Sequence, residues 1–320
     1  MKKWQKVTLG TVGAVVSLVI IAAFALSYYI SASLGSNPLE KRREFWATLP
    51  ELHADTLLAE YGLLECEKIT LVTADDLELE ALHFPSHNGA AIIIQHGGFA
   101  RGSDMIPMAA MFIRQGYGAI LPTLRAHGES GGELITFGHH EVKDLEAAYQ
   151  YLANRPEVDP EKIGAIGTSM GGALVILYAA DNPKIKAVVA ESPYHELSKE
   201  SVAAFTGMPW PIPALIVYFL EQKLGFPLAS VSPVNRIGEI SPRPVFIMMG
   251  GSDPMVPPEG GEALYAAAGE PRTYWYEDHL DHLGFSQLIN MLIAEPDLTQ
   301  AAAFEARVTA FFNQYLLGEN

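Results

Sequence analysis

Residues 163–180 read IGAIGTSMGGALVILYAA: a short apolar run, a glycine-rich turn and a longer apolar run. The first run is typical of a strand that is buried on both faces, and the second is long enough for a helix. The turn, GTSMG at 167–171, matches the pattern G-x-S-x-G. A sharp strand-to-helix turn with this pattern exposes the serine hydroxyl, so Ser169 is a candidate nucleophile. The five residues alone also fit a helix-capping serine or a phosphate-binding loop, although no Lys-Ser or Lys-Thr pair follows.

Strands and helices alternate on both sides of this unit from Cys66 onward. Repeated strand–helix units predict an α/β fold class with a mostly parallel sheet and helices on both faces. The predicted strands are Ile69–Thr73, Leu77–Phe84, Ala90–Gln95, Gly118–Pro122, Lys162–Gly167, Lys186–Ala190, Pro244–Met249 and Arg272–Tyr276. The predicted helices are Asp104–Gln115, Glu141–Asn154, Met170–Asp181, Pro258–Ala268 and Ala301–Leu317.

Residues 194–240 interrupt this alternation. They contain several prolines around Trp210, then the helix-like segment Ala214–Leu224, and they are rich in large apolar side chains. A long surface connection is the simplest interpretation. The apolar content instead favours a helical lid over the C-terminal edge of the sheet. We expect Trp210 of this lid to bind the substrate.

A serine hydroxyl needs a base, and the base needs an acid to orient it. Asp253 follows a predicted strand in Gly250-Gly251-Ser252-Asp253-Pro254, and His282 follows the last predicted strand. The order Ser169, Asp253, His282 is the order expected of an α/β-hydrolase. Asp253 also fits an ordinary turn before proline. His279 is the rival base, and it could also be mistaken for half of a metal-binding pair with His282.

An oxyanion hole is expected upstream and beside the serine. The strand Ala90–Gln95 ends in His96-Gly97-Gly98-Phe99, where a backbone N–H can point at a developing oxyanion without obstruction. The N–H of Met170, the residue after the nucleophile, is the other expected donor. His96 is expected to be structural, and Phe99 to contact the substrate.

Together these motifs resemble those of the α/β-hydrolase superfamily over residues 66–318. The motifs are His96-Gly97-Gly98, Arg125-Ala126-His127-Gly128-Glu129-Ser130, Gly167–Gly172, Gly251-Ser252-Asp253 and His282. The segment from Ser232-Pro233-Val234 to Pro257, with the apolar N-terminus, is similar to Bem46-like and ABHD13-like serine hydrolases. The resemblance implies an eight-stranded sheet, a Ser169–His282–Asp253 triad and hydrolysis of esters, thioesters or amides through an acyl-enzyme. The glycine pair resembles the HGGG motif of lipases, with Phe99 in place of the third glycine. The upstream oxyanion donor is therefore Gly98 or Phe99, and we favour Gly98.

The N-terminus has the length and composition of a membrane anchor. Val7–Ile30 is a run of uncharged, mostly apolar residues, long enough to span the ~30 Å hydrocarbon core. A cleaved signal peptide is the alternative, but its apolar region is usually only about 7–15 residues. Lys2, Lys3 and Lys6 favour a cytoplasmic N-terminus, and therefore a single-pass protein with an extracytoplasmic body. Lys41, Arg42 and Arg43 favour the opposite orientation, but they lie further from the apolar run. The predicted division is an anchor at 1–36, a connector with one amphipathic helix at 37–64 and a hydrolase domain at 65–320.

Composition limits the remaining classes of function. The net charge of −16 disfavours nucleic-acid binding, and the lone Cys66 rules out an internal disulfide or a Cys-rich zinc site. We expect no metal and no cofactor, because the triad needs neither. The predicted function is a membrane-anchored serine hydrolase acting on a small-molecule ester or thioester with a hydrophobic acyl chain, with no protein partner predicted. The alternatives are a peptidase, amidase or acyltransferase on the same triad, and a non-catalytic binding domain.

Overall fold

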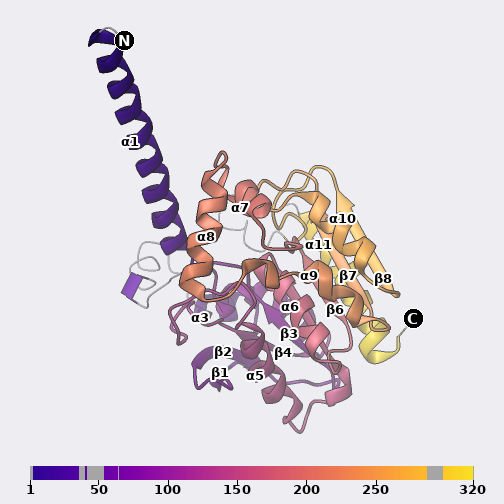
Figure 1. Cartoon of the computed structure of the whole chain (residues 1–320). Coiled ribbons are helices and arrows are strands. Elements are labelled where there is room, and N and C mark those ends of the chain that lie inside the picture. The colour runs from indigo at the N-terminus through magenta and orange to yellow at the C-terminus, as the bar shows by residue number, and fades with distance from the viewer. Residues whose placement is uncertain (1–2, 36–39, 42–53, 64, 287–297, 320) are drawn as a thin grey trace.

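A computed structural model describes residues 3–35, 40–41, 54–63, 65–286 and 298–319. Its centre is an eight-stranded sheet with the order β1-β2-β4-β3-β5-β6-β7-β8 (Figure 1). β2 pairs antiparallel with both β1 and β4, and all other neighbours are parallel. The predicted mostly parallel, eight-stranded α/β-hydrolase sheet is therefore confirmed. The strands are β1 Glu67–Val72, β2 Glu78–Phe84, β3 Ala91–Gln95, β4 Gly118–Pro122, β5 Ile163–Thr168, β6 Val188–Glu191, β7 Val245–Gly250 and β8 Arg272–Glu277.

Helices cover both faces of this sheet, which is why the central strands are mostly apolar until their last residue. In β3, the side chain of Ile93 joins a cluster with α5 and α6, whereas Ile92 and Ile94 join a second cluster with α4 and α11. Alternate side chains of a strand point to opposite faces, so both faces of β3 are buried in apolar layers. The helices are α1 Lys3–Leu34, α3 Ala54–Glu60, α4 Ile106–Ile113, α5 Val142–Ala153, α6 Met170–Asp181, α7 Lys199–Thr206, α8 Ile212–Leu224, α9 Pro233–Arg236, α10 Pro258–Ala267 and α11 Leu298–Phe312.

Several boundaries differ from the sequence-based prediction. The expected helix Asp104–Gln115 is a 3₁₀ turn followed by α4, because Pro107 lacks an N–H and fits best in the first turn of a new helix. The lid, residues 194–240, contains α7 as well as the expected α8. The final helix begins at Leu298 and ends in a π-helical turn, Asn313–Leu317.

The connector is partly packed on the body. α3 lies within it, and Leu57 and Leu63 are buried in the same apolar cluster as α4. Cys66 packs against that cluster, and burial raises the pKa of its thiol to about 11. Residues 36–39 and 42–53 of the predicted anchor and connector lie outside the described residues.

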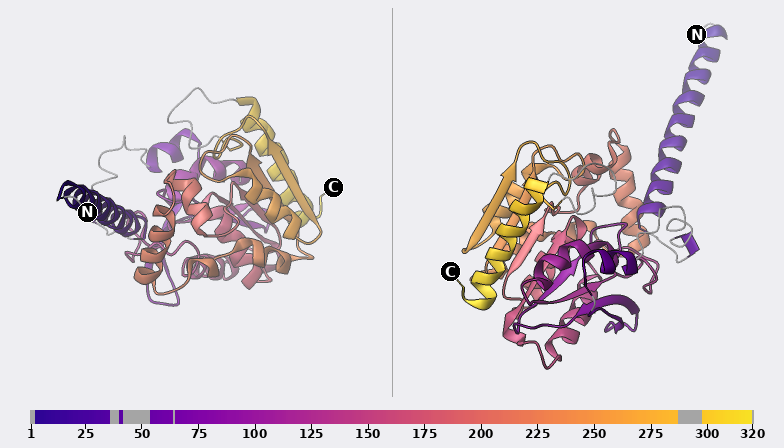
Figure 2. Two further views of the ribbon diagram at one scale, coloured as in Figure 1. Left: turned by 45° about the horizontal axis from the view of Figure 1, so that its top comes forward. Right: turned by 180° about the vertical axis from the view of Figure 1, so that it is seen from behind.

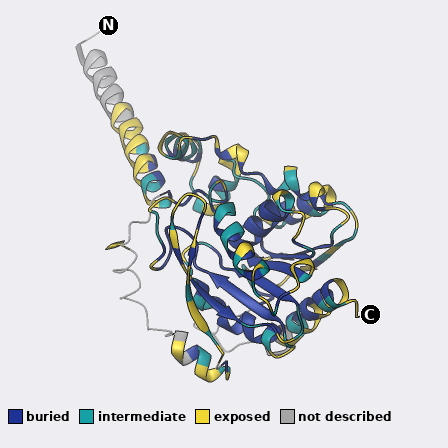
Figure 3. Ribbon diagram, turned by 90° about the horizontal axis from the view of Figure 1, so that it is seen from below, coloured by how far each residue is buried: buried dark blue, intermediate teal, exposed yellow. Residues whose placement is uncertain are grey.

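The N-terminal helix projects away from the body beside α8 (Figures 1 and 2). From Ser17 to Tyr29 most of its residues are exposed, whereas the strands of the sheet are mostly buried (Figure 3). Within the described ranges, α1 is the one continuous helix long and apolar enough to cross a membrane, and a signal sequence would have the same features.

Candidate active site

Ser169 lies in the turn between β5 and α6, where the backbone is unusual for a residue with a side chain. Its φ is 54° and its ψ is −121°, a combination that L-residues other than glycine rarely adopt. The neighbouring glycines make this turn sterically feasible. A Cβ on Gly167 would lie 2.2 Å from the carbonyl oxygen of Gly171, and one on Gly171 would lie 2.4 Å from that of His96. The turn therefore presents a partly exposed Ser169 at the carboxyl edge of the sheet.

The loop after β3 lies directly against this turn. A Cβ on Gly97 would be 3.1 Å from the Cβ of Ser169 and 3.7 Å from its Oγ, so a glycine is needed there. A Cβ on Gly98 would meet nothing within 4 Å, and Phe99 follows with a positive φ of 60°. Met170 is the first residue of α6, where backbone N–H groups have no intrahelical partner. The two expected donors are thus on the loops that flank Ser169, and their role in an oxyanion hole stays a prediction.

His96 holds the loop after β3 in place. Its Nδ1 donates to the carbonyl oxygen of Gly97 at 2.6 Å, and its Nε2 accepts the N–H of Leu124 at 3.0 Å. These two bonds define a neutral imidazole. Full burial lowers the pKa of His96 to about 3, so it stays neutral across the physiological range. His96 therefore has the structural role expected from the sequence.

Asp253 and His282 form a direct pair. Oδ2 of Asp253 lies 2.6 Å from Nδ1 of His282, while Oδ1 accepts the backbone N–H groups of Met255 and Val256 at 2.8 and 2.9 Å. The carboxylate side chain is fully buried and the imidazole is 13% exposed. His279, the rival base, is an exposed residue of the same loop. Asp253 therefore orients His282 and leaves the Nε2 atom of that ring for another partner.

Backbone contacts between the loops after β7 and β8 bring this pair together. The N–H of Gly251 donates to the carbonyl oxygen of Glu277 at 2.9 Å, and the N–H of Ser252 donates to that of Leu280 at 2.9 Å. A Cβ on Gly250 would lie 2.5 Å from the carbonyl oxygen of Asp281. The glycine pair before Asp253 is thus required for two neighbouring loops to approach closely.

Sequence reasoning missed Glu191, the last residue of β6. Its carbonyl oxygen accepts the N–H of Ser169 at 2.8 Å, and its carboxylate accepts the N–H of Ser286 at 3.0 Å. Glu191 therefore connects the turn that carries Ser169 to the loop that carries His282. Burial raises the pKa of its carboxyl to about 7, and the positive charge of His282 acts in the opposite direction. A charged residue at the end of the apolar strand VVAE was the available signal.

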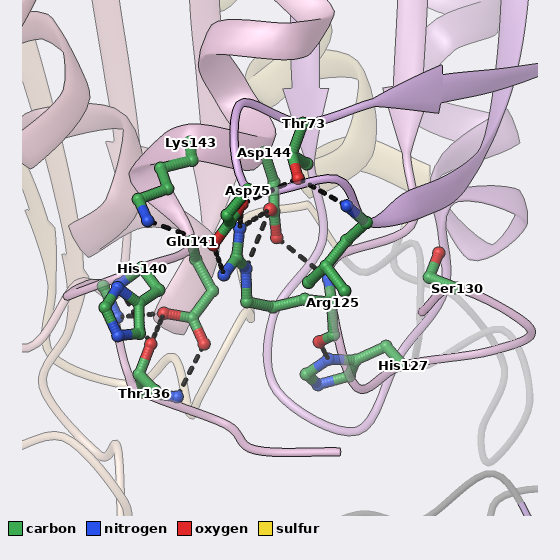
Figure 4. A network of polar contacts seen from close by, with 12 residues as sticks. Thr73, Asp75, Arg125, His127, Ser130, Thr136, His140, Glu141, Lys143 and Asp144 are labelled. Carbon is green, nitrogen blue, oxygen red and sulfur yellow. Dashed lines mark hydrogen bonds and ion pairs between the residues drawn. The ribbon is translucent and has the colours of Figure 1, made fainter. Parts of the chain in front are cut away.

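The Arg125-to-Ser130 motif belongs to a structural network (Figure 4). The Arg125 guanidinium contacts Asp144 of α5 at 2.7 Å and Asp75 of the β1–β2 turn at 2.9 Å. The guanidinium holds the pKa of Asp75 well below its usual range, since hydrogen bonds to Arg125 stabilise the carboxylate. Ser130 Oγ donates to the carbonyl oxygen of Thr123 at 2.7 Å. This network fastens the loop after β4 to the turn and helix on either side of it.

The two predicted substrate-binding residues are both exposed. Phe99 is 54% exposed beside the Ser169 turn, and Trp210 is 69% exposed between α7 and α8. Lys199 Nζ lies 5.5 Å from the centroid of the Trp210 ring. Across the described ranges, His, Cys, Asp and Glu side chains form no group of three or more suited to a metal ion.

A sequence profile of the prolyl oligopeptidase family matches residues 108–284. The chain belongs to this family. The matched region contains Ser169, Glu191, Asp253 and His282 together with the lid. Family and fold make the chain a hydrolase of the α/β-hydrolase type.

Individual proteins are also similar to this chain. The YqkD protein of Bacillus subtilis is 25% identical over 226 residues, which cover 68% of this chain and 73% of the relative. The thiohydrolase aneE of Aspergillus aculeatus is 25% identical over 187 residues, covering 57% of this chain and 54% of the relative. The esterase Pf2001 of Pyrococcus furiosus has the same fold, with a TM-score of 0.65 at 22% identity, covering 84% of this chain and 98% of the esterase.

Proposed function

We propose that this hydrolase cleaves carboxylic esters or thioesters through an acyl-enzyme on Ser169. The observation that carries the proposal is the strained, positive-φ turn of Ser169 at the sheet edge where Asp253 and His282 are paired. Backbone strain of this kind persists where the surrounding structure enforces it, most often at functional sites. A helix-capping serine would need neither the strain nor an oriented histidine nearby.

The reaction follows from the chemistry of these groups. Ser169 Oγ attacks the carbonyl carbon while Nε2 of His282 takes its proton, and Asp253 stabilises the imidazolium through Nδ1. The N–H groups of Gly98 and Met170 donate to the oxyanion of the tetrahedral intermediate. The intermediate expels an alcohol or thiol, which takes the proton from His282 and leaves an acyl-enzyme. Water, deprotonated by His282, then releases the acid and restores Ser169.

Esters and thioesters fit best as substrates. Two of the similar proteins are described as an esterase and a thiohydrolase, and the exposed apolar side chains Phe99 and Trp210 suit a hydrophobic acyl group. Peptide or amide cleavage is the second candidate, favoured by the name of the matching family. Acyl transfer would need an acceptor other than water on the same acyl-enzyme. No cofactor or metal enters any of these steps.

We also propose that α1 is an uncleaved, single-pass membrane anchor with the body outside the cytoplasm. Its large apolar side chains are exposed, including Leu18 at 65% and Ile21 at 63%. Such a surface is costly in water and favourable in lipid. The resemblance to the membrane-anchored subfamily supports this arrangement. The substrate is then a small acyl compound that partitions into, or lies near, a lipid surface.

A fluorophosphonate probe tests the nucleophile directly. Wild-type protein should be labelled at Ser169, and a folded Ser169→Ala variant should remain unlabelled. The variant should lose ester turnover by about 10⁴-fold or more. Matched turnover of ester, thioester and peptide substrates by the wild type then separates the candidates. Labelling of Ser169→Ala at the wild-type level would disprove the assignment.

A further inference from the structure

We propose that the tip of the lid is a membrane-docking surface that lies in the lipid–water interface. The lid tip is defined as Phe205 of α7, Met208, Trp210 and Pro211 of the α7–α8 turn, and Tyr218 of α8. The partner is a lipid bilayer, and specifically the one that α1 enters. The inference rests on the proposed membrane anchor and extends it from a tether to a contact that orients the enzyme.

The first observation is that α1 packs against α8. The ring of Phe219 lies 6.2 Å from that of Phe24 and 5.6 Å from that of Tyr28, both in edge-to-face geometry. At the far end of the contact, Lys223 Nζ donates to the carbonyl oxygen of Ala32 at 3.0 Å. Aromatic packing and a charge-assisted hydrogen bond at separate points fix the relative orientation of the two helices. The anchor is therefore joined to the lid and does not leave the body on a free linker.

The second observation is the direction of this contact. Ser27 Oγ lies 3.5 Å from the carbonyl oxygen of Ile212, at the start of α8, whereas Ala32 meets Lys223 near its end. The two helices therefore run the same way. The α7–α8 turn, which precedes Ile212, must point along α1 toward its exposed N-terminal part. Figures 1 and 2 show the turn on that side of the body.

The third observation concerns depth. The part of α1 on the N-terminal side of its printed contacts with α8, Lys3–Ala23, rises about 32 Å at 1.5 Å per residue. A hydrocarbon core needs ~30 Å, so this part alone can span it. The membrane boundary then falls near Ser27, at the level of Ile212. Trp210 is two residues before Ile212 and therefore lies at the interface.

The fourth observation is the chemistry of the lid tip. Phe205, Trp210 and Tyr218 are 42%, 69% and 53% exposed, although large aromatic side chains are costly in water. Tryptophan and tyrosine are enriched at membrane interfaces, where the ring is buried and the polar atom stays hydrated. The ammonium of Lys199 lies over the Trp210 ring and 3.8 Å from the Glu200 carboxylate, so its charge is offset locally. The rest of the chain is strongly acidic, so this surface differs from it mainly in its exposed aromatic side chains.

The consequence for function is a route for apolar substrate. The lid follows β6, and the catalytic loops follow β5, β7 and β8 at the same carboxyl edge of the parallel sheet. A lid tip in the interface therefore brings the edge that carries Ser169 close to the lipid. Acyl substrates dissolved in the bilayer would reach the lid without crossing bulk water.

Site-specific fluorescence in vesicles tests the position of the lid tip. Full-length protein with Cys66→Ser, which removes its one cysteine, is given Trp210→Cys and labelled with an environment-sensitive NBD dye. The protein is reconstituted into phosphatidylcholine vesicles. The matched control is Glu161→Cys, because Glu161 is exposed and precedes β5 at the opposite edge of the sheet. Phe205→Cys and Tyr218→Cys provide further positions if Trp210→Cys does not fold.

Iodide in the buffer and a doxyl group on the lipid acyl chain, near the headgroup, are the two quenchers. We expect the lid-tip dye to be quenched several-fold less by iodide than the dye at position 161, and to be quenched by the doxyl lipid. Equal iodide quenching at both positions would overturn the proposal. Protection from iodide without quenching by the doxyl lipid would also overturn it, because protein would then cover the tip.

The test does not depend on catalysis. Ser169→Ala in the same vesicles should give unchanged quenching, so failure of the proposed chemistry leaves this measurement valid. If protein expressed from the full-length sequence were purified without its N-terminal residues, that segment would be a cleaved signal peptide. The basis for the docking would then be removed. If the lid-tip dye were protected from iodide and quenched by the doxyl lipid while Ser169 failed to react with the probe, the docking proposal would stand. The proposed hydrolase mechanism would be rejected.

Discussion

The helices α6 and α8 are nearly equal in length and both are apolar, yet they have different surroundings. α6 has 12 residues and buries Met170–Ala179 in full, whereas α8 has 13 and buries only Pro213, Ile216 and Leu220. α6 is enclosed by the sheet and neighbouring helices, while α8 lies at the surface against α1. Apolar composition therefore predicts that a helix will be covered, but it does not predict which part of the protein, or which partner, covers it. In the proposed function, α6 carries the nucleophile at its N-terminus, and in the proposed docking α8 holds the lid against a membrane.

The largest expected effect is at the catalytic end of α6. His282→Ala should lower kcat by about 10⁴-fold, because the proposed nucleophile Ser169 loses the base that Asp253 orients. His279→Ala, three residues earlier on the exposed face of the same loop, is the matched control and should keep activity within a few-fold. Steady-state kinetics on a small soluble ester measure both. Loss of turnover in His279→Ala with normal turnover in His282→Ala would show that the Asp253 contact does not mark the base.

The next prediction compares how tightly the ends of α6 and α8 are packed. Gly171→Ala at the start of α6 should lower the free energy of unfolding by more than about 3 kcal/mol, because the new Cβ would lie 2.4 Å from a backbone oxygen. Gly225→Ala at the end of α8 is the control. Its φ is 81°, but a Cβ there would meet nothing within 4 Å, so we expect a loss of about 1 kcal/mol.

Thermal or chemical unfolding in detergent measures both variants. Equal losses would contradict the distinction between a crowded α6 terminus and an open α8 terminus. Retention of full stability in Gly171→Ala would mean that the loop after β3 moves away from α6, and ester turnover should then fall because Gly97 packs against Ser169.

The same contrast shows which features the sequence could predict. The strand–turn–helix around Ser169 was predictable from three features of the sequence that indicate the same structure. They are the two apolar runs, the spacing of the glycines between them, and the order of Ser169, Asp253 and His282 along the chain. The structure pairs Asp253 with His282, the base that the sequence favoured over His279. The order of the strands in the sheet came from the structure alone.

α7 was missed, since Lys199–Thr206 is short and has one buried residue, Val202. The contact between α1 and α8 was missed because the local sequence of an apolar helix does not indicate which other helix it packs against.

Glu191 shows the limit most clearly, and it supplies the smallest expected effect. A single buried carboxylate produces no periodic pattern in the sequence. The residue nevertheless lies beneath the first turn of α6, where a Cβ on Gly172 would be 3.0 Å from the backbone carbonyl oxygen of Glu191. Burial raises the pKa of this carboxyl from 4.5 to about 7. Between these values the unfolded chain has lost the proton while the folded chain keeps it. The free energy of unfolding must therefore fall as pH rises through this window.

Glu191→Gln removes this proton and keeps the shape, so it should remove that part of the pH dependence. Relative to the variant, the wild type should lose about 3 kcal/mol between about pH 4.5 and pH 8. Other titrating groups are common to both proteins and cancel in the difference. Glu221→Gln is the control on α8, because the Glu221 carboxylate also accepts one backbone N–H, that of Leu228 at 3.0 Å.

Activity gives an independent measure of the same residue. Because the carboxyl of Glu191 keeps its proton up to about pH 7 in the folded chain, Glu191→Gln should leave the acidic limb of the kcat/KM profile in place and change the limb above pH 7, where the wild type gains a buried negative charge. Glu221→Gln should leave both limbs in place. A merely structural glutamate would change the height of the profile and not its position. If both variants kept the wild-type profile and the wild-type pH dependence of unfolding, Glu191 would be no more than part of the packing below α6.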